Sequence, residues 1–153
     1  MIELAPTPPF RILVIENDAI DGHDLHATLR NHAGDSATQV LLVAPALSSR
    51  LRFWVSDIDP ARRRAEARLA HSLPGLGGEG IEVAGSIGDA EPLQAIADGL
   101  RVFAADEIFL VTHPEEEAHW VEHDLVERAR EQFSEIPIFH LVAGPRRVQP
   151  AAA

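Results

Sequence analysis

Several short apolar segments of the sequence end in polar or small residues, and these residues are the first candidates for chemistry. If the segments are parallel strands, their carboxyl ends meet at one edge of a sheet, where ligands bind in open α/β folds. Carboxylate, amide, hydroxyl and imidazole groups gathered there can bind a small polar ligand. The candidate crevice consists of Asn17, Asp18, Val43, Ala44, Gly88, Asp89, Thr112 and His113.

No familiar catalytic arrangement accompanies these residues. Ser48, Ser49 and Ser56 lack the G-x-S-x-G turn of a nucleophilic serine, and no glycine-rich phosphate loop ends in lysine. The chain contains no cysteine, which excludes thiol catalysis and thiolate metal sites. We therefore expect no catalytic residues and no enzymatic activity.

One segment matches a metal-binding pattern. His119 and His123, with Glu122 between them, form H-x-x-E-H, the inverted zinc-peptidase motif. The acidic residues that follow belong to the same predicted helix, so no separate segment supplies a third ligand. The sequence predicts no metal site. His26, three residues after His23 in another predicted helix, is expected to be exposed.

Charge and composition limit the possible partners. The chain has 153 residues and a formal charge of −11, with 13 basic residues that are all arginine. Such a surface repels nucleic acid and anionic membranes. No apolar run approaches the roughly 20 residues of a membrane span, and residues 1–10 lack the pattern of a signal peptide. We expect a cytoplasmic protein.

The elements that must position the candidate residues alternate regularly. Apolar segments rich in β-branched residues predict strands at 11–16, 39–44, 81–86, 107–111 and 138–143. Helical spacing predicts helices at 23–33 and 59–73, a third after the expected N-cap Asp89, and a fourth from about Pro114 to Phe133. Pro92 falls in the first turn of the third helix, and Gly34 ends the first.

This alternation predicts one α/β domain, a three-layer sandwich around a five-stranded parallel sheet. The domain covers residues 11–143, between a lead-in at 1–10 and a flexible tail at 144–153. The glycine-rich residues 74–80 precede a strand, so they are interpreted as a flexible connection and not as a phosphate cradle.

The order of two motifs resembles the universal stress protein family. Ile-Gly-Asp-Ala at 87–90 precedes a predicted helix, and Ala-Asp at 105–106 precedes the apolar strand 107–111. The resemblance implies the strand order 3-2-1-4-5 of adenine nucleotide alpha hydrolase-like, Rossmann-like folds. It also implies a homodimer formed by the fifth strands, with an interface made by Ile138, Phe139, His140, Leu141 and Val142.

The phosphate-binding motif of that family is missing. Its ATP-binding members carry Gly-x2-Gly-x9-Gly-Ser/Thr after the fourth strand, and here Thr112, Glu115 and either Asp124 or Leu125 occupy the glycine positions. Glu115, Glu116 and Glu117 would oppose a triphosphate. The resemblance therefore implies a divergent member with no cofactor. The alternative is a member that binds ATP or AMP through an atypical phosphate loop.

A third interpretation remains open. Residues 12–18 (ILVIEND) also resemble the first strand of a receiver domain, with Asp57 as the imagined phosphate acceptor, although the receiver lysine is absent. The leading hypothesis is a non-enzymatic, dimeric module with a stress-related or regulatory role, which acts through a protein partner or a small ligand.

Overall fold

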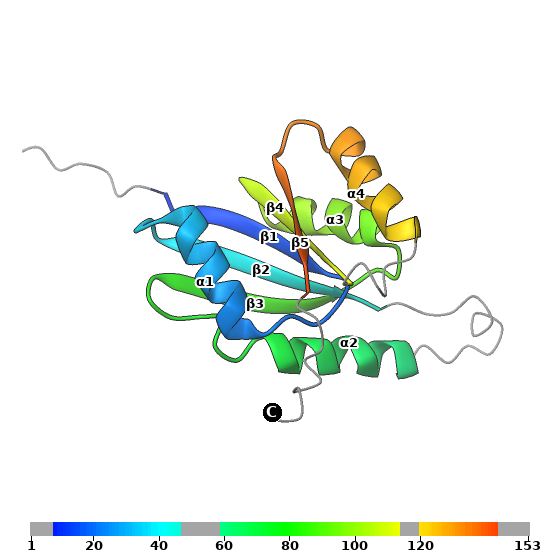
Figure 1. Ribbon diagram of the computed structural model, residues 1–153, viewed down its shortest axis with the longest axis horizontal. Coiled ribbons are helices and arrows are strands. Elements are labelled where there is room, and N and C mark those ends of the chain that lie inside the picture. The colour runs from blue at the N-terminus through cyan, green and yellow to red at the C-terminus, as the bar shows by residue number, and fades with distance from the viewer. Residues whose placement is uncertain (1–7, 47–58, 114–119, 144–153) are drawn as a thin grey trace, which may run out of the picture.

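The computed structural model describes residues 8–46, 59–113 and 120–143. Strands and helices alternate along the chain (Figure 1). The strands are β1 (Phe10–Glu16), β2 (Thr38–Pro45), β3 (Ile81–Gly88), β4 (Glu107–Thr112) and β5 (Ile138–Val142). The helices are α1 (Gly22–Ala33), α2 (Asp59–Ser72), α3 (Pro92–Val102) and α4 (Trp120–Gln132).

The strands form one parallel sheet in the order β3-β2-β1-β4-β5. This confirms the predicted fold class and the strand order that the family resemblance implied. β1 lies at the centre, where Ile12 is level with Val40 of β2 and with Glu107 of β4. The winding direction reverses between β1 and β4, since the chain crosses from β3 over β2 and β1 to reach β4.

Helices cover both faces of the sheet, with α1 and α2 on one face and α3 and α4 on the other (Figure 1). Side chains alternate along a strand, so β1 serves two separate cores. Ile12 and Val14 pack in the core under α1 and α2, whereas Leu13 and Ile15 pack in the core under α3 and α4. All four side chains are fully buried.

The C-terminal end of α1 follows the sequence prediction, and the helix begins one residue earlier than predicted, at Gly22. Asp21 is the N-cap, and its side chain accepts hydrogen bonds from the N–H groups of His23 and Asp24. Gly34 ends the helix with φ of 64°, a conformation that glycine adopts without a side-chain penalty. The capped helix sets the direction in which the chain leaves the carboxyl end of β1.

The start of α3 differs from the prediction. Asp89 is not the N-cap, because the helix begins at Pro92 and Glu91 occupies the cap position without a side-chain bond. The Asp89 carboxylate instead accepts a hydrogen bond from Glu91 N–H at 2.9 Å. Pro92 does lie at the first position of the helix, where its missing N–H costs nothing. The strand also continues through Gly88, so the chain turns later than expected.

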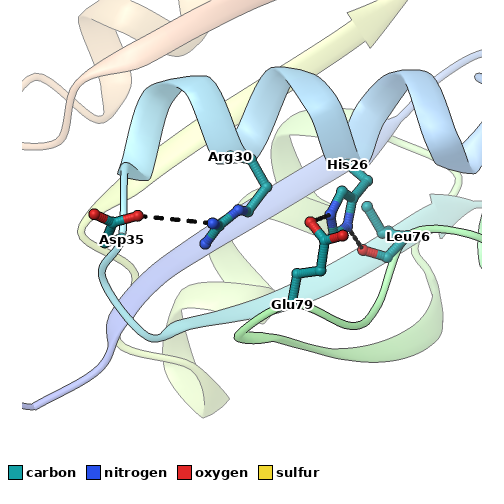
Figure 2. Close-up of polar contacts among 5 residues, drawn as sticks. All are labelled: His26, Arg30, Asp35, Leu76 and Glu79. Carbon is teal, nitrogen blue, oxygen red and sulfur yellow. Dashed lines mark hydrogen bonds and ion pairs between the residues drawn. The ribbon is translucent and has the colours of Figure 1, made fainter.

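An imidazole anchors the glycine-rich turn to α1. The ring of His26 contacts Leu76 O at 2.6 Å through Nδ1 and Glu79 Oε2 at 3.4 Å through Nε2, as Figure 2 shows. The His26 side chain is only 15% exposed, so the prediction of an exposed histidine is wrong. The Leu76 residue itself is fully buried. The turn is therefore held by α1, whereas the sequence suggested a flexible connection. One turn further along α1, Arg30 Nη2 lies 3.8 Å from Asp35 Oδ1, an ion-pair contact that Figure 2 also shows.

An aromatic cluster connects the edge strand β5 to α1. The ring of His32 packs edge to face against Phe139 of β5 at 4.6 Å and against Phe109 of β4 at 5.3 Å between centroids. His32 also makes an ion-pair contact with Glu107. Edge-to-face aromatic pairs contribute about 0.5–1.5 kcal/mol beyond their buried area. Phe139 thus contributes to the packing of β5 against α1 within the chain.

Some predictions lie outside the described residues. These are the lead-in as far as residue 7, Asp57 of the receiver interpretation, the start of the fourth helix at 114–119 and the tail at 144–153. Among the helices that the structure does describe, none is long and apolar enough to cross a membrane.

Close backbone packing at Gly22 yields a prediction about stability. A Cβ atom at this position would lie 1.9 Å from Pro74 O and 2.4 Å from Ser72 O. Replacing an exposed helical glycine with alanine normally stabilises by about 0.5–1 kcal/mol. We expect Gly22→Ala instead to lower the free energy of unfolding by about 1–3 kcal/mol, because the backbone of α1 must move away from the turn. Urea denaturation measures the change.

Gly77→Ala is the matched control. A Cβ at Gly77 would meet Ile81 O at 3.6 Å, an ordinary contact, so this variant should unfold like the wild type. A Gly22→Ala protein as stable as the wild type would contradict this account of the contact.

Candidate functional site

The carboxyl ends of β1 and β4 bring four of the predicted crevice residues together. Asn17 and Asp18 follow β1, and Thr112 and His113 lie at the end of β4. Asn17 N–H donates to Val111 O at 2.9 Å, which joins the two strand ends. His113 Nε2 lies 3.8 Å from Asp18 Oδ1. These residues meet at the reversal point of the sheet, where ligands bind in open α/β folds.

The other predicted crevice residues have different surroundings. Val43 and Ala44 are 4% and 0% exposed and pack in the two cores, so their side chains are shielded. Gly88 packs so closely that an added Cβ would lie 2.6 Å from Val43 Cγ1. Asp89 is exposed and holds the turn before α3. Among the crevice residues predicted here, only the group at β1 and β4 forms a polar cluster.

A buried acid that the sequence analysis missed lies beside this cluster. Glu16, the last residue of β1, is 0% exposed, and neither carboxylate oxygen has a hydrogen-bond partner among the described residues. Burial raises the pKa of Glu16 to about 8, because desolvation penalises the charged form more than the nearby Ser72 hydroxyl and Arg68 guanidinium favour it. At neutral pH this side chain is therefore mostly protonated.

Helix α2 brings a cation to the same place. Arg68 Nη2 donates to Pro45 O at the end of β2, and its Nε is buried without a partner in the described part of the chain. Burial lowers the pKa of this guanidinium from its ordinary value, while the charges of Glu16 and Asp18 act in the opposite direction. The Ser72 hydroxyl, one turn further along α2, is fully buried. Arg68 is thus bonded to the end of β2, while its charge acts on the acid at the end of β1.

The sequence contains signals for these residues. Glu16 has the same parity along β1 as Ile12 and Val14, so it points to the α1 and α2 face. Arg68 and Ser72 each follow an inward residue of α2, Ala65 and Leu69, by three positions, which places them beside the buried stripe. Strand parity and helix spacing therefore point to both residues, although charged side chains are usually exposed.

A hydroxyl and an imidazole meet between β4 and β5. Thr112 Oγ1 lies 2.6 Å from His140 Nε2. A nucleophile and its base also meet at this distance, but Thr112 is only 2% exposed. The contact satisfies a buried hydroxyl at a strand end. His140 itself is exposed, so its ring reaches Thr112 from the surface of the sheet edge.

Metal binding has no support in the described residues. In the ranges that the structure covers, no group of three or more histidine and acidic side chains is arranged to hold a metal ion. His119 and the His123 side chain, the residues of the zinc-like motif, lie outside the described part.

Comparison with solved structures identifies the fold. A universal stress protein family protein from Arabidopsis thaliana, solved with AMP bound, matches with a TM-score of 0.53 and 13% identity over 94% of this chain and 97% of that chain. A universal stress protein solved in complex with cAMP has a TM-score of 0.45 and 15% identity over 90% of this chain and 100% of that chain. No protein-family model and no curated protein matches the sequence. By its strand order and the first of these likenesses, the chain has the universal stress protein fold.

The protonation of Glu16 predicts how stability depends on pH. The ordinary pKa of 4.5 applies to the unfolded chain, whereas the folded value is about 8. Between these values only the folded state holds the proton. The contribution of Glu16 to the free energy of unfolding is therefore fully present below pH 4.5 and falls as pH rises toward 8, by about 1.4 kcal/mol per pH unit.

Glu16→Gln removes the titrating group and should remove this slope. Urea denaturation from pH 5 to pH 8 should show the variant gaining stability relative to the wild type with each step. Glu127→Gln, an exposed change on α4, serves as control and should follow the wild type. Parallel pH profiles of the Glu16→Gln protein and the wild type would show that Glu16 does not hold its proton in the folded state.

Proposed function

We propose that this protein is a non-enzymatic, divergent member of the universal stress protein family, which forms a dimer and acts through protein contacts without binding ATP. The observation that carries the proposal is the acidity of the edge where the sheet reverses. Asp18 is buried there at 8% exposure beside His113. Such an edge is a poor receptor for a triphosphate, which carries several negative charges.

The sequence after β4 adds to this acidity. Glu115, Glu116 and Glu117 replace the residues that would close around phosphates through backbone N–H groups. Arg68, the cation nearest to Glu16 among those described, already donates to Pro45 O. Among the residues that the structure describes, little positive charge is therefore free to compensate a polyphosphate at this edge.

The absence of enzymatic activity is supported by the state of the reactive groups. A serine or threonine nucleophile needs an adjacent base and access to substrate. Thr112 contacts an imidazole but is buried, and the Ser72 hydroxyl is fully buried. The best-placed hydroxyls in the described part of the chain thus serve packing.

AMP binding is the second candidate function. The structural neighbour from Arabidopsis thaliana was solved with AMP bound. A monophosphate needs fewer phosphate contacts than ATP, and a protonated Glu16 adds no charge to oppose it. A nucleoside monophosphate is therefore the nucleotide that this edge would tolerate best.

Thermal unfolding with nucleotides tests both candidates. We expect millimolar ATP with magnesium to leave the melting temperature unchanged within about 1 °C, since a ligand present at 100 times its dissociation constant would stabilise by about 2.7 kcal/mol. A shift of several degrees with ATP would overturn the proposal. A shift with AMP alone would establish the second candidate, and Asp18→Asn should enlarge it by removing a negative charge.

The proposed dimer uses the edge strand β5. The backbone groups of Pro137 and Ala143 bond to β4, so the alternate residues Ile138, His140 and Val142 direct theirs outward. Val142 is 46% exposed although it is a large apolar residue. Antiparallel pairing of two such strands about a two-fold axis would cover Val142 and satisfy the outward groups.

A substitution at Val142 tests this dimer better than one at Phe139 or Leu141, which pack against the core of their own subunit. We expect light scattering to give twice the chain mass of 16.7 kDa for the wild type and the single mass for Val142→Asp. Val102→Asp, at an apolar residue that is 82% exposed on α3, is the matched control and should remain dimeric. A monomeric wild type at micromolar concentration would reject the dimer.

A further inference from the structure

The opposite edge of the sheet presents a longer row of free backbone groups. β3 pairs with β2 along its whole length, from Ile81 to Gly88. Gly80 O and Gly88 O accept hydrogen bonds from Thr38 and Ala46, so the even-numbered residues direct their backbone groups toward β2. Backbone direction alternates along a strand, and the odd-numbered residues therefore face outward.

The first outward residue is already satisfied. Ile81 exchanges hydrogen bonds of 2.9 and 3.0 Å with Gly78, which closes the turn over the start of the strand. The next outward residues are Val83, Gly85 and Ile87, and nothing in the described part of the chain bonds their N–H and C=O groups. Three consecutive outward residues form a template on which another strand can pair.

Devices that normally protect an edge are largely missing from β3. The strand contains no proline or lysine and no bulge interrupts its register with β2. Glu82 is its one charged residue. By comparison, the β5 edge is shorter, and Arg130 already donates to Ile138 O at 3.3 Å. Within the described ranges, β3 is therefore the more open of the two edges.

A groove lies beside this edge on the face that α3 only partly covers. It has a volume of ≈ 260 Å³ and is lined by Gln39, Val40, Leu41, Glu82, Val83, Ala84 and Phe103. Leu41 and Phe103 are partly buried, whereas Glu82, Ala84 and Ser86 are exposed. A strand added to β3 would direct alternate side chains over this groove, because its pleat continues that of the sheet.

We infer that the β3 edge binds an extended segment of a partner protein by strand addition, with a bulky apolar side chain over the groove and a basic side chain beside Glu82. Main-chain hydrogen bonds to Val83, Gly85 and Ile87 supply affinity, and alternate side chains supply specificity. The basic side chain is favoured by Glu82 itself and by the net charge of −11. This inference rests on the proposed function, since it names the surface through which the module meets its partner.

A second copy of β3 does not supply the bulky apolar side chain and the basic side chain that the groove and Glu82 favour. On the groove side it offers Glu82, Ala84 and Ser86, which would bring a second carboxylate and only small side chains to the groove. Pairing β3 with the β5 edge of another copy is not isologous, and repeated it would give an open polymer. The occupant is therefore a segment of a different protein.

Fluorescence anisotropy with a labelled peptide of sequence TRTLTRT tests the inference on the full chain. This peptide places leucine between two arginines on one face, and it reads the same in either direction. We expect saturable binding that is tighter than that of TETLTET. Glu82→Arg should reverse the order of the two affinities, whereas Glu131→Arg, the matched charge change on α4, should not.

Two further variants separate the backbone contacts from the groove. Val83→Pro removes an outward N–H but leaves the hydrogen bonds between β3 and β2 in place. It should lower the affinity for TRTLTRT about tenfold. Ala84→Phe fills the groove from an exposed position and should also lower the affinity for TRTLTRT. This variant keeps the test decisive if the proline variant fails to fold. Val142→Asp should bind like the wild type, so failure of the β5 dimer does not affect this result.

The inference is overturned if the wild type binds neither peptide, or binds both equally and without change in the β3 variants. It is also overturned if the wild type forms oligomers that Val83→Pro dissolves and Val142→Asp does not, because the occupant of the edge would then be a second copy.

Discussion

Burial of β1 on both faces is the constraint on which the rest of this structure depends. Its side chains alternate between two cores, one under α1 and α2 and one under α3 and α4. Neither core forms without the central strand, and both neighbouring strands take their register from it. Full burial of residues 12–16 gives the strand its stability through apolar area removed from water. It also forces the last side chain, Glu16, into the interior, where a carboxylate would be costly.

The polar cluster at the reversal point follows from that constraint. A protonated Glu16 avoids the cost of a buried charge, and Arg68 finds its hydrogen bond at Pro45 instead of pairing with an ionised acid. Asp18 and His113 lie beside each other at the ends of β1 and β4, and Glu115 to Glu117 follow β4 in the sequence. In the described part of the chain, the edge that binds ligands in other open α/β sheets thus carries buried acidic side chains.

The two edges of the sheet differ in a way that suits two kinds of contact. β5 is short, is held to α1 by Phe139 and His32, and presents Val142. β3 is longer, has small exposed side chains and leaves three residues with outward backbone groups. A dimer formed through β5 would place the two β3 edges at opposite ends of one continuous sheet. Each would then be free to pair with a partner segment without interfering with the dimer.

The sequence by itself determined the strands, the helices and the α/β class, because apolar periodicity and capping are local properties. It also predicted that Asn17, Asp18, Thr112 and His113 meet, since parallel strands end at one edge. Tertiary structure alone decided the rest. Glu16 became a protonated interior acid through packing against α2, and His26 became partly buried by contact with Leu76, 50 residues further along the chain. Asp89 lost its predicted cap role when β3 continued to Gly88. These outcomes depend on contacts between distant segments. Strand parity and helix spacing point to Glu16 and Arg68 individually, but a local pattern does not show which segments meet.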